Sequence, residues 1–223
     1  MSKQTTTEGK KSNVGTIILM LVLAGIFVGV GLFTLKLGKP KPVGQGEIAI
    51  NLQRFKMVAP FDLIDQNSQP VNQDAFDDKV TIVNFIFTSC AAECPFLSRR
   101  MEEVQAEFAD NPNVQLMSVT VDPRTDNPER LKNYGETYNA GPKWRFLTGD
   151  TKIITKLIKE SFLLPAEEAE EKKVYLTKTT FVHSEKIAVV DQLGVVRFYA
   201  DGMNPNAGNA LVQATEKLLA IGN

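Results

Sequence analysis

The sequence predicts an α/β fold, in which helices cover both faces of a β-sheet, preceded by one transmembrane helix. The fold follows from two patterns that alternate from residue 80 to residue 221: segments rich in β-branched and aromatic residues, and amphipathic segments of helical period. The membrane helix follows from a third observation, since no charged residue stands between Ser12 and Leu35. We therefore expect one membrane span and one domain with a buried core.

The uncharged run at residues 14–35 is long enough to span a membrane as a helix, since about 20 apolar residues cross the hydrocarbon core. A cleaved signal peptide is the alternative, but its apolar region is about 7–15 residues long and ends at a small-residue cleavage site. Neither condition holds here, so we expect an uncleaved anchor. Residues 1–13 then form a short cytoplasmic tail, 36–46 a linker rich in Pro and Gly, and 47–223 the globular domain.

Charge near the span leaves its orientation open, because lysines stand on both sides of it. Three precede the run and three follow it: Lys3, Lys10 and Lys11, then Lys36, Lys39 and Lys41. A large domain can be translocated whatever its flanking charge. Residues 1–13 hold no Arg, which argues against a mitochondrial transit peptide. We expect a single-pass protein of a bacterial cytoplasmic membrane, with the C-terminal domain facing the periplasm or cell exterior.

Charge and cysteine content exclude two classes of protein. The 25 basic and 26 acidic residues give a net charge of −1, but six Lys and one Glu fall in residues 1–42, which leaves the rest of the chain at −6. An acidic domain gives no reason to expect nucleic-acid binding. Two Cys and one His in 223 residues are too few for a disulfide-stapled secreted fold, and this favours a chemical role for the Cys pair.

Strands and helices are expected to follow one another along the domain. Residues 80–87 have the β-branched and aromatic composition of a buried strand. The helix after them carries four apolar residues on one face: Leu97, Met101, Val104 and Phe108. The later elements are a strand at 114–121, a helix ending near 138, a short strand at 145–147, a helix over 151–160, a hairpin of 187–191 and 195–199, and a helix over 207–221. Alternation of this kind predicts a sheet covered by helices on both faces.

The helix that ends near residue 138 begins with a capping sequence, Asp126-Asn127-Pro128-Glu129. Asp followed three residues later by Glu, with Pro in the first turn, is typical of a helix N-terminus. We therefore expect Asp126 to cap this helix. The charged run at residues 167–173 is interpreted as a solvated loop or a frayed helix.

Cys90 and Cys94 lie between the predicted buried strand and the helix after it. Pro95 suits the first helical position, which makes Cys94 the expected N-cap residue. The free amides and the dipole at a helix start stabilise negative charge, so we expect the pKa of the Cys94 thiol to be lowered. Cys90 precedes Cys94 by about one turn of chain, so the two thiols are expected to converge on one point.

The spacing of the two cysteines leaves three roles open: a structural disulfide, a redox-active pair and a soft-metal site. An iron–sulfur cluster needs four ligands, and a closed zinc site needs one more ligand than Cys90, Cys94 and His183 supply. Copper fits this donor set best, although Asp, Glu or water completing a zinc site stays open. His183 by itself is equally consistent with a structural or exposed residue.

Four stretches of the chain carry a family resemblance. They are residues 84–95, with Cys90, Cys94 and Pro95; 118–129, with Asp122 and Asp126; 144–149; and 183–194, which begins at His183. Together and in this order they resemble the Sco/SenC family of copper proteins, which take part in cytochrome c oxidase assembly. The stretches extend over most of residues 60–220, and the predicted N-terminal anchor agrees with the same family.

The resemblance implies a thioredoxin-like fold in which Cys90, Cys94 and His183 bind copper, as Cu(I) or Cu(II). It implies a metallochaperone, not a turnover enzyme, that passes copper from an unidentified donor to the dinuclear copper (CuA) site of oxidase subunit II. The alternative is a thiol–disulfide oxidoreductase in which Cys90 and Cys94 keep the copper-ligand cysteines of the oxidase reduced. Related oxidoreductases have a shorter CxxC and a proline beside it. Residues 180–183 lack that proline, and both differences favour metal binding.

Overall fold

The structure is a computed structural model that describes residues 49–165 and 184–222 of the chain. The predicted tail, membrane span and linker lie outside the described residues, as do His183 and the charged run at 167–173. Within residues 49–165 and 184–222, no helix is both long and apolar enough to cross a bilayer.

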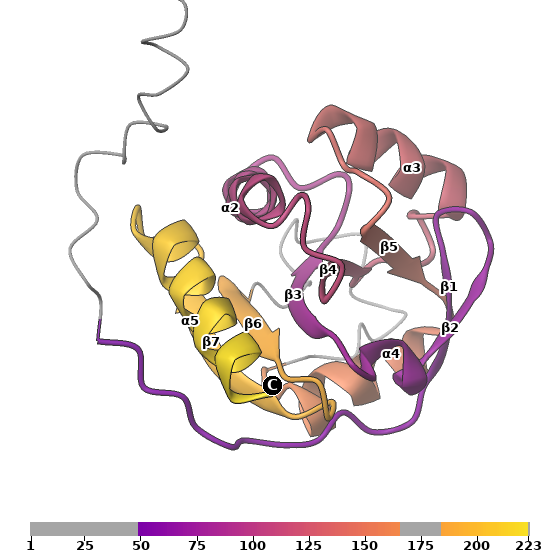
Figure 1. The fold of residues 1–223 in the computed structure, drawn as a ribbon. Coiled ribbons are helices and arrows are strands. Elements are labelled where there is room, and N and C mark those ends of the chain that lie inside the picture. The colour runs from indigo at the N-terminus through magenta and orange to yellow at the C-terminus, as the bar shows by residue number, and fades with distance from the viewer. Residues whose placement is uncertain (1–48, 166–183, 223) are drawn as a thin grey trace, which may run out of the picture. The chain divides into compact units, whose positions relative to one another are not determined.

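The described residues form a mixed seven-stranded sheet (Figure 1). Its strands are β1 (Asp62–Asp65), β2 (Pro70–Asn72), β3 (Val80–Ile86), β4 (Val114–Thr120), β5 (Trp144–Thr148), β6 (Lys186–Val190) and β7 (Val196–Asp201). Their order across the sheet is β2-β1-β5-β4-β3-β6-β7, and the central strands β3, β4 and β5 are parallel. Antiparallel strands continue the sheet on both sides, β1 beside β5 and β6 beside β3.

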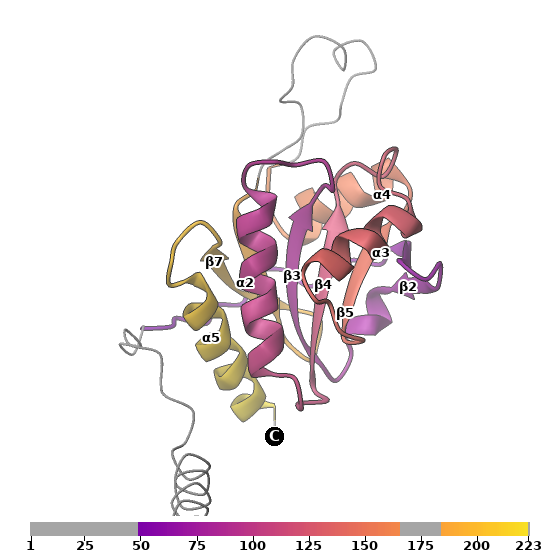
Figure 2. The same cartoon turned by 90° about the horizontal axis from the view of Figure 1, so that it is seen from above.

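Helices cover both faces of this sheet, as predicted. Figure 2 shows α2 (Cys94–Glu107), α3 (Pro128–Thr137) and α5 (Ala207–Ile221) together on one face. The opposite face is covered by α4 (Thr151–Lys156), which continues into a π-helical turn, η2 (Leu157–Ser161), and by the 3₁₀ turn η1 (Gln73–Phe76). The helix predicted over 151–160 is therefore present, with its last turn widened.

The central strand β3 is buried along its whole length because both of its faces meet helices. Ile82 and Ile86 pack into the core beneath α2, α3 and α5, while Val83 and Phe85 pack into the core beneath α4 and η2. Alternate residues thus serve opposite cores. Trp144 on β5, fully buried, stacks on Phe146 in the first of these cores, with ring centroids 5.0 Å apart.

The hairpin of β1 and β2 was not predicted from the sequence. Its turn is held by Asp65, whose carboxylate accepts hydrogen bonds from the backbone N–H groups of Asn67 and Gln69. Ser68 in this turn has a φ of 60°. Strands of three and four residues with polar members give little periodic signal, so local sequence did not reveal them.

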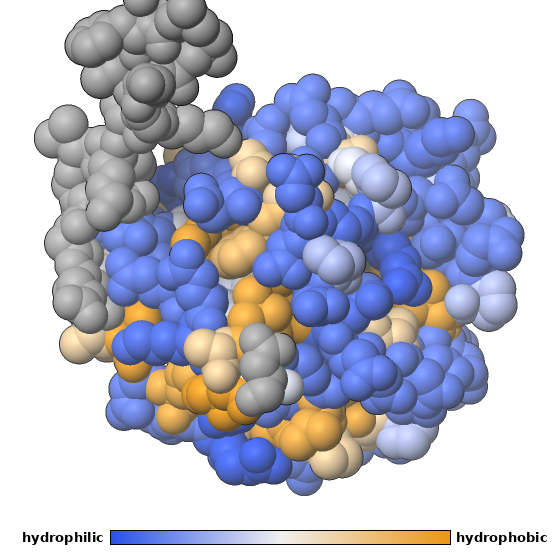
Figure 3. Space-filling model, in the orientation of Figure 1, coloured by the Kyte–Doolittle hydropathy of each residue, from blue (hydrophilic) through white to orange (hydrophobic). Residues whose placement is uncertain are grey.

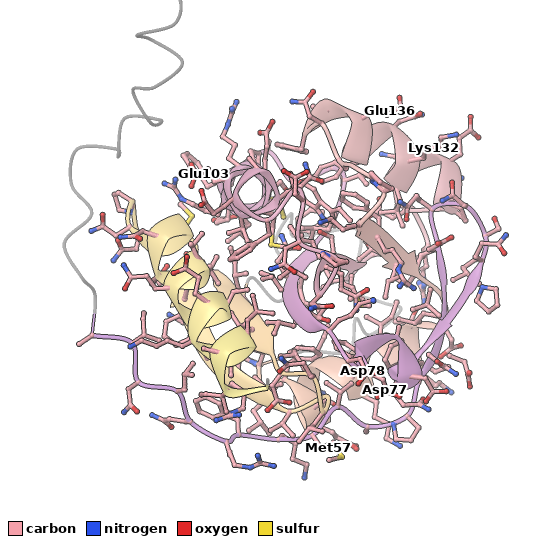
Figure 4. All side chains as sticks on the ribbon, viewed as in Figure 1. Met57, Asp77, Asp78, Glu103, Lys132 and Glu136 are labelled. Atoms are coloured by element: carbon pink, nitrogen blue, oxygen red, sulfur yellow. The ribbon has the colours of Figure 1, made fainter. Side chains whose placement is uncertain are left out.

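Two exposed apolar side chains lie near the amino end of β3. Met57, which is 60% exposed, pairs with Val195 in an isolated bridge, and Leu193 in the neighbouring hairpin is 66% exposed. Figure 4 shows Met57 near Asp77 and Asp78, the residues just before β3, and Figure 3 shows apolar surface along this edge. The surfaces of α2 and α3 are charged instead: Glu103, Lys132 and Glu136 point outwards (Figure 4).

Candidate metal centre

The two cysteines lie where the chain leaves the carboxyl end of β3 and enters α2. Cys94 is the first residue of α2 and only 4% exposed, whereas Cys90 in the preceding loop is half-buried. The backbone N–H of Cys94 donates to the Sγ atom of Cys90 at 3.5 Å. The fold therefore brings Cys90 to the start of the helix that carries Cys94, as the sequence predicts.

The loop between the two cysteines is folded back onto the end of β3. The backbone N–H of Cys90 donates to the carbonyl oxygen of Phe87 at 3.1 Å. A backbone hydrogen bond of Phe87 also reaches the Cys94 thiol. The Cys90 thiol points toward Glu93, with 3.9 Å between Sγ and Oε2. Both sulfur atoms are thus oriented by backbone groups of one short segment.

The N-terminus of α2 differs from the prediction by one residue. The N-cap is Glu93, whose side chain makes no capping hydrogen bond, and Cys94 is already helical. Pro95 lies in the first turn, where its missing N–H costs nothing, as expected.

The expected lowering of the Cys94 pKa is wrong. Burial raises the pKa of the Cys94 thiol to about 12, because a thiolate there would lose its water. The Phe87 backbone hydrogen bond acts in the opposite direction, and the neighbouring Cys90 and Glu93 raise the pKa further. Desolvation therefore outweighs the helix N-terminus, and Cys94 is a neutral thiol at physiological pH.

The chain returns to this loop just after His183. Ser184 lines a small pocket together with Cys94 and five other residues: Phe85, Phe87, Glu93, Leu97 and Val121. His183 itself lies outside the described residues, so its place beside the sulfur atoms stays a prediction. Among residues 49–165 and 184–222, no group of three or more His, Cys, Asp or Glu is arranged to hold a metal ion.

Asp126 does not cap α3, contrary to expectation. Asn127 is the N-cap residue, and its side chain accepts the backbone N–H of Arg130 at 2.9 Å. The carboxylate of Asp126 is instead fully buried and accepts hydrogen bonds from Thr88 and Thr120. The sequence therefore predicted the helix start correctly, but the N-cap is one residue later than expected.

The ligand atoms available at this end of the sheet indicate which metal it could bind. Two sulfur atoms from Cys90 and Cys94 converge at the edge of a mostly apolar core, and thiolates are ligands that Cu(I) prefers. Two sulfur donors suffice for Cu(I), while a third donor is needed before Cu(II) is well held. The described part of the site therefore offers two sulfur donors of the kind that Cu(I) prefers.

Comparison with known proteins decides the family. A model of the SCO1/SenC family matches residues 51–219. The chain belongs to the SCO1/SenC family. Its seven-stranded sheet with helices on both faces is the family's thioredoxin-like α/β fold, as the structural relatives bear out.

Three relatives illustrate the extent of the SCO1/SenC likeness. An SCO2-like protein of Rickettsia prowazekii is 29% identical over 198 residues, which cover 86% of this chain and 92% of the relative. Copper-bound ScoI of Bradyrhizobium japonicum is 26% identical with a TM-score of 0.59, over 73% of this chain and 99% of ScoI. BsSco is 24% identical with a TM-score of 0.64, over 76% of this chain and 98% of BsSco. BsSco is described as a Sco-family cytochrome c oxidase assembly protein with a disulfide switch.

Proposed function

We propose that this protein is a membrane-anchored copper carrier that acts in cytochrome c oxidase assembly, with Cys90, Cys94 and His183 as the copper ligands. The observation that carries the proposal is the hydrogen bond from the Cys94 backbone N–H to Cys90 Sγ at 3.5 Å, which brings two soft donors to one point. Copper bound to ScoI of Bradyrhizobium japonicum, a relative over 73% of this chain, supports the choice of metal.

The third ligand is proposed from the course of the chain. Ser184 lines the same pocket as Cys94, and His183 is the residue that immediately precedes Ser184 in the sequence. An imidazole joining two thiolates is a donor set that accommodates Cu(II) as well as Cu(I). His183 would thereby let one site hold copper in both oxidation states.

Copper is the cargo, and it is loaded by exchanging protons for metal. Both ligands must lose their thiol protons, so binding of one Cu(I) to Cys90 and Cys94 releases two protons. Because burial makes the Cys94 thiol costly to ionise, this thiol stays protonated and neutral until copper binds. Ligand exchange at the more exposed Cys90 is the natural first step of release, since an acceptor thiol reaches it most easily.

The proposed recipient is the CuA site of oxidase subunit II, and the donor is another copper carrier of unknown identity. The description of BsSco as a member of a family of oxidase assembly proteins supports this assignment. The uncharged run at residues 14–35 supports an anchor in a bacterial cytoplasmic membrane, with the copper-binding domain on its outer side. Carrier and recipient would then meet at the same membrane surface.

Titration with Cu(I) tests the proposal directly. The reduced full-length protein in detergent is titrated in competition with a chromophoric Cu(I) chelator, beside the variants Cys90→Ser, Cys94→Ser and His183→Ala. We expect one copper per chain, strong binding lost in both Cys variants and weakened in the His variant. Met57→Leu, which changes an exposed thioether at the other end of β3, is the matched control and should bind like wild type.

Three outcomes would contradict this function or replace it. Binding unchanged in a Cys94→Ser, His183→Ala double variant removes the copper site. Oxidase assembly restored in a deletion strain by His183→Ala, but by neither Cys variant, assigns the Cys pair to thiol–disulfide exchange instead. A protein that stays disulfide-bonded in mild reductant and ignores copper has a structural disulfide.

A further inference from the structure

The buried carboxylate of Asp126 has no part in the chemistry described so far. It is fully excluded from solvent, yet it lies next to the loop that carries the two cysteines. Its Oδ2 atom accepts the backbone N–H of Thr88 at 3.0 Å and the hydroxyl of Thr120 at 2.6 Å. Its Oδ1 atom accepts the hydroxyl of Thr88 at 2.5 Å. Hydrogen bonds to a charged acceptor are the strong ones, so Thr88 is firmly held.

Thr88 connects this carboxylate to the thiols. It follows Phe87, whose carbonyl accepts the Cys90 backbone N–H and whose backbone hydrogen bond reaches the Cys94 thiol. A shift of Thr88 would therefore move the backbone groups that orient both sulfur atoms. Asp126 holds Thr88 from a segment 38 residues further along the chain, so this contact exists only in the folded protein.

A helix-capping role does not account for Asp126, because Asn127 caps α3. The three acceptor contacts of its carboxylate go to the ends of β3 and β4, beside the Cys loop. Burial of a carboxylate is costly, and a helix start does not require it. The placement is explained if the carboxylate fixes the loop.

We propose that Asp126 is a positioning residue for the Cys90–Cys94 pair. Its carboxylate holds Thr88 so that the two sulfur atoms stay close before copper binds. Copper binding then costs less conformational entropy, because the ligands are already ordered. This inference rests on the proposed function and extends it to a residue that does not touch the metal. Loss of an outer residue that orients metal ligands typically weakens metal binding by about 10–100-fold.

Three substitutions separate positioning from folding. Asp126→Asn keeps the size but replaces one acceptor oxygen by an NH₂ group. Either the Thr88 hydroxyl loses its acceptor, or the Thr88 backbone N–H and the Thr120 hydroxyl both do. Thr88→Val removes the hydroxyl donor, and Thr88→Ser retains it. Asp191→Asn is the matched control, because Asp191 is also buried and accepts backbone amides, but near the amino end of β3.

The full-length reduced variants are measured for Cu(I) affinity, for the thiolate-to-Cu(II) absorption band and for thermal unfolding. We expect about 10–100-fold weaker Cu(I) binding in Asp126→Asn, a loss in the same direction in Thr88→Val, and near wild-type binding in Thr88→Ser. The absorption band should shift in the first two variants. Asp191→Asn should unfold at lower temperature, with unchanged affinity and an unchanged band.

A measurement without metal tests the position of the two thiols separately from copper binding. Glutathione disulfide oxidises the pair to a Cys90–Cys94 disulfide and becomes two glutathione molecules, so the equilibrium constant reports how closely the thiols are held. We expect this constant to fall about tenfold in Asp126→Asn and Thr88→Val, which is about 30 mV in potential.

The outcomes are distinguishable. Wild-type protein that binds no copper through its cysteines removes the proposed function, while the glutathione equilibrium still tests Asp126. Copper bound by wild type, together with affinity, absorption band and glutathione equilibrium all unchanged in Asp126→Asn and Thr88→Val, overturns the positioning role. If Asp126→Asn does not fold, the contrast between Thr88→Val and Thr88→Ser decides.

Discussion

The two ends of the central strand β3 each have a buried aspartate, but the two are built differently. Near the amino end, Asp191 accepts the backbone N–H groups of Leu193 and Val195 and pairs with Arg197 at 2.8 Å. All these partners lie within six residues of it. At the carboxyl end, Asp126 accepts hydrogen bonds from Thr88, 38 residues away in sequence.

The two aspartate networks differ in how much of the chain they connect. The Asp191 network closes one hairpin and is complete within a short piece of chain. The Asp126 network joins the ends of β3 and β4 beside the Cys loop, and it forms only when these two strands, distant in the chain, are paired. We expect the first to act on folding alone, and the second to act on the metal site as well.

The largest effect on stability is expected at the hairpin end. Asp191→Ala leaves two backbone N–H groups without their side-chain acceptor and removes the carboxylate partner of the partly buried Arg197, which should lower the free energy of unfolding by about 3 kcal/mol. Urea unfolding measures this, with copper affinity as the second readout. A fall in copper affinity in the variant protein, while still folded, would contradict the separation of the two ends.

The Cys end should show the reverse result. Cys94→Ser should weaken Cu(I) binding by at least about 100-fold, or about 2.7 kcal/mol, while the protein stays folded. Chelator competition and circular dichroism on the same sample measure the two quantities. Ser98→Ala is the control. Ser98 lies on the next turn of α2, and its hydroxyl is hydrogen-bonded to the Tyr134 hydroxyl. Equal losses in both variants would point to helix disruption.

Copper affinity should rise with pH, because copper displaces the thiol protons. The pKa of Cys94 is raised to about 12, so at pH 6–8 its proton is in place and competes with the metal. We expect the apparent Cu(I) affinity to increase at least about 30-fold from pH 6 to pH 7.5, since each displaced proton contributes about tenfold per pH unit and the Cys94 proton is displaced over this whole range. Cys94→Ser should flatten this slope, whereas Asp191→Asn should leave it unchanged.

A moderate effect is expected from the residue that caps α3. Asn127→Ala removes the side-chain acceptor of the Arg130 backbone N–H and should cost about 1 kcal/mol of stability. Copper affinity should be unchanged, because the neighbouring Asp126 contacts remain. Thermal unfolding and Cu(I) titration check this. An affinity loss equal to that of Asp126→Asn would return Asp126 to a role at the helix start.

The smallest expected effect is the coupling between the two aspartates. Asp126→Asn and Asp191→Asn lie near opposite ends of β3 and share no partner, so their stability losses should add to within about 0.5 kcal/mol. Asp126→Asn and Thr88→Val share a hydrogen bond and should not add. Double-mutant cycles in urea measure both. Additive stability losses in Asp126→Asn and Thr88→Val would contradict the proposed coupling of Asp126 to Thr88.

Most regular elements were predictable from local pattern. The β-branched and aromatic composition of residues 80–87 reflects burial on both faces of the strand, and the helical spacing of Leu97, Met101 and Val104 reflects burial of one helix face. Each segment carries this pattern in its own sequence. The strands β1 and β2 were not predicted, because they are short and their turn depends on hydrogen bonds to the Asp65 side chain. The order of strands was not readable, since it depends on which distant segments pair.

The candidate site shows the same division. The positions of Cys90 and Cys94 at the end of a buried strand followed from sequence, but the pKa of Cys94 did not. Helix-start chemistry is local and predicted a lowered pKa, while the extent of burial is set by packing and raised it. The contact of Asp126 with Thr88 was not predicted for a related reason. The local capping pattern already explained Asp126, and its partner Thr88 is distant in the chain.

Local sequence pattern was enough to predict an α/β domain with two thiols after a buried strand, and a family resemblance that the SCO1/SenC match confirms. Tertiary structure alone decided that Cys94 is buried as a neutral thiol and that Asp126 holds the loop above it. The physical reason is that desolvation and long-range hydrogen bonding depend on neighbours far away in the chain, which meet only after the sheet has assembled.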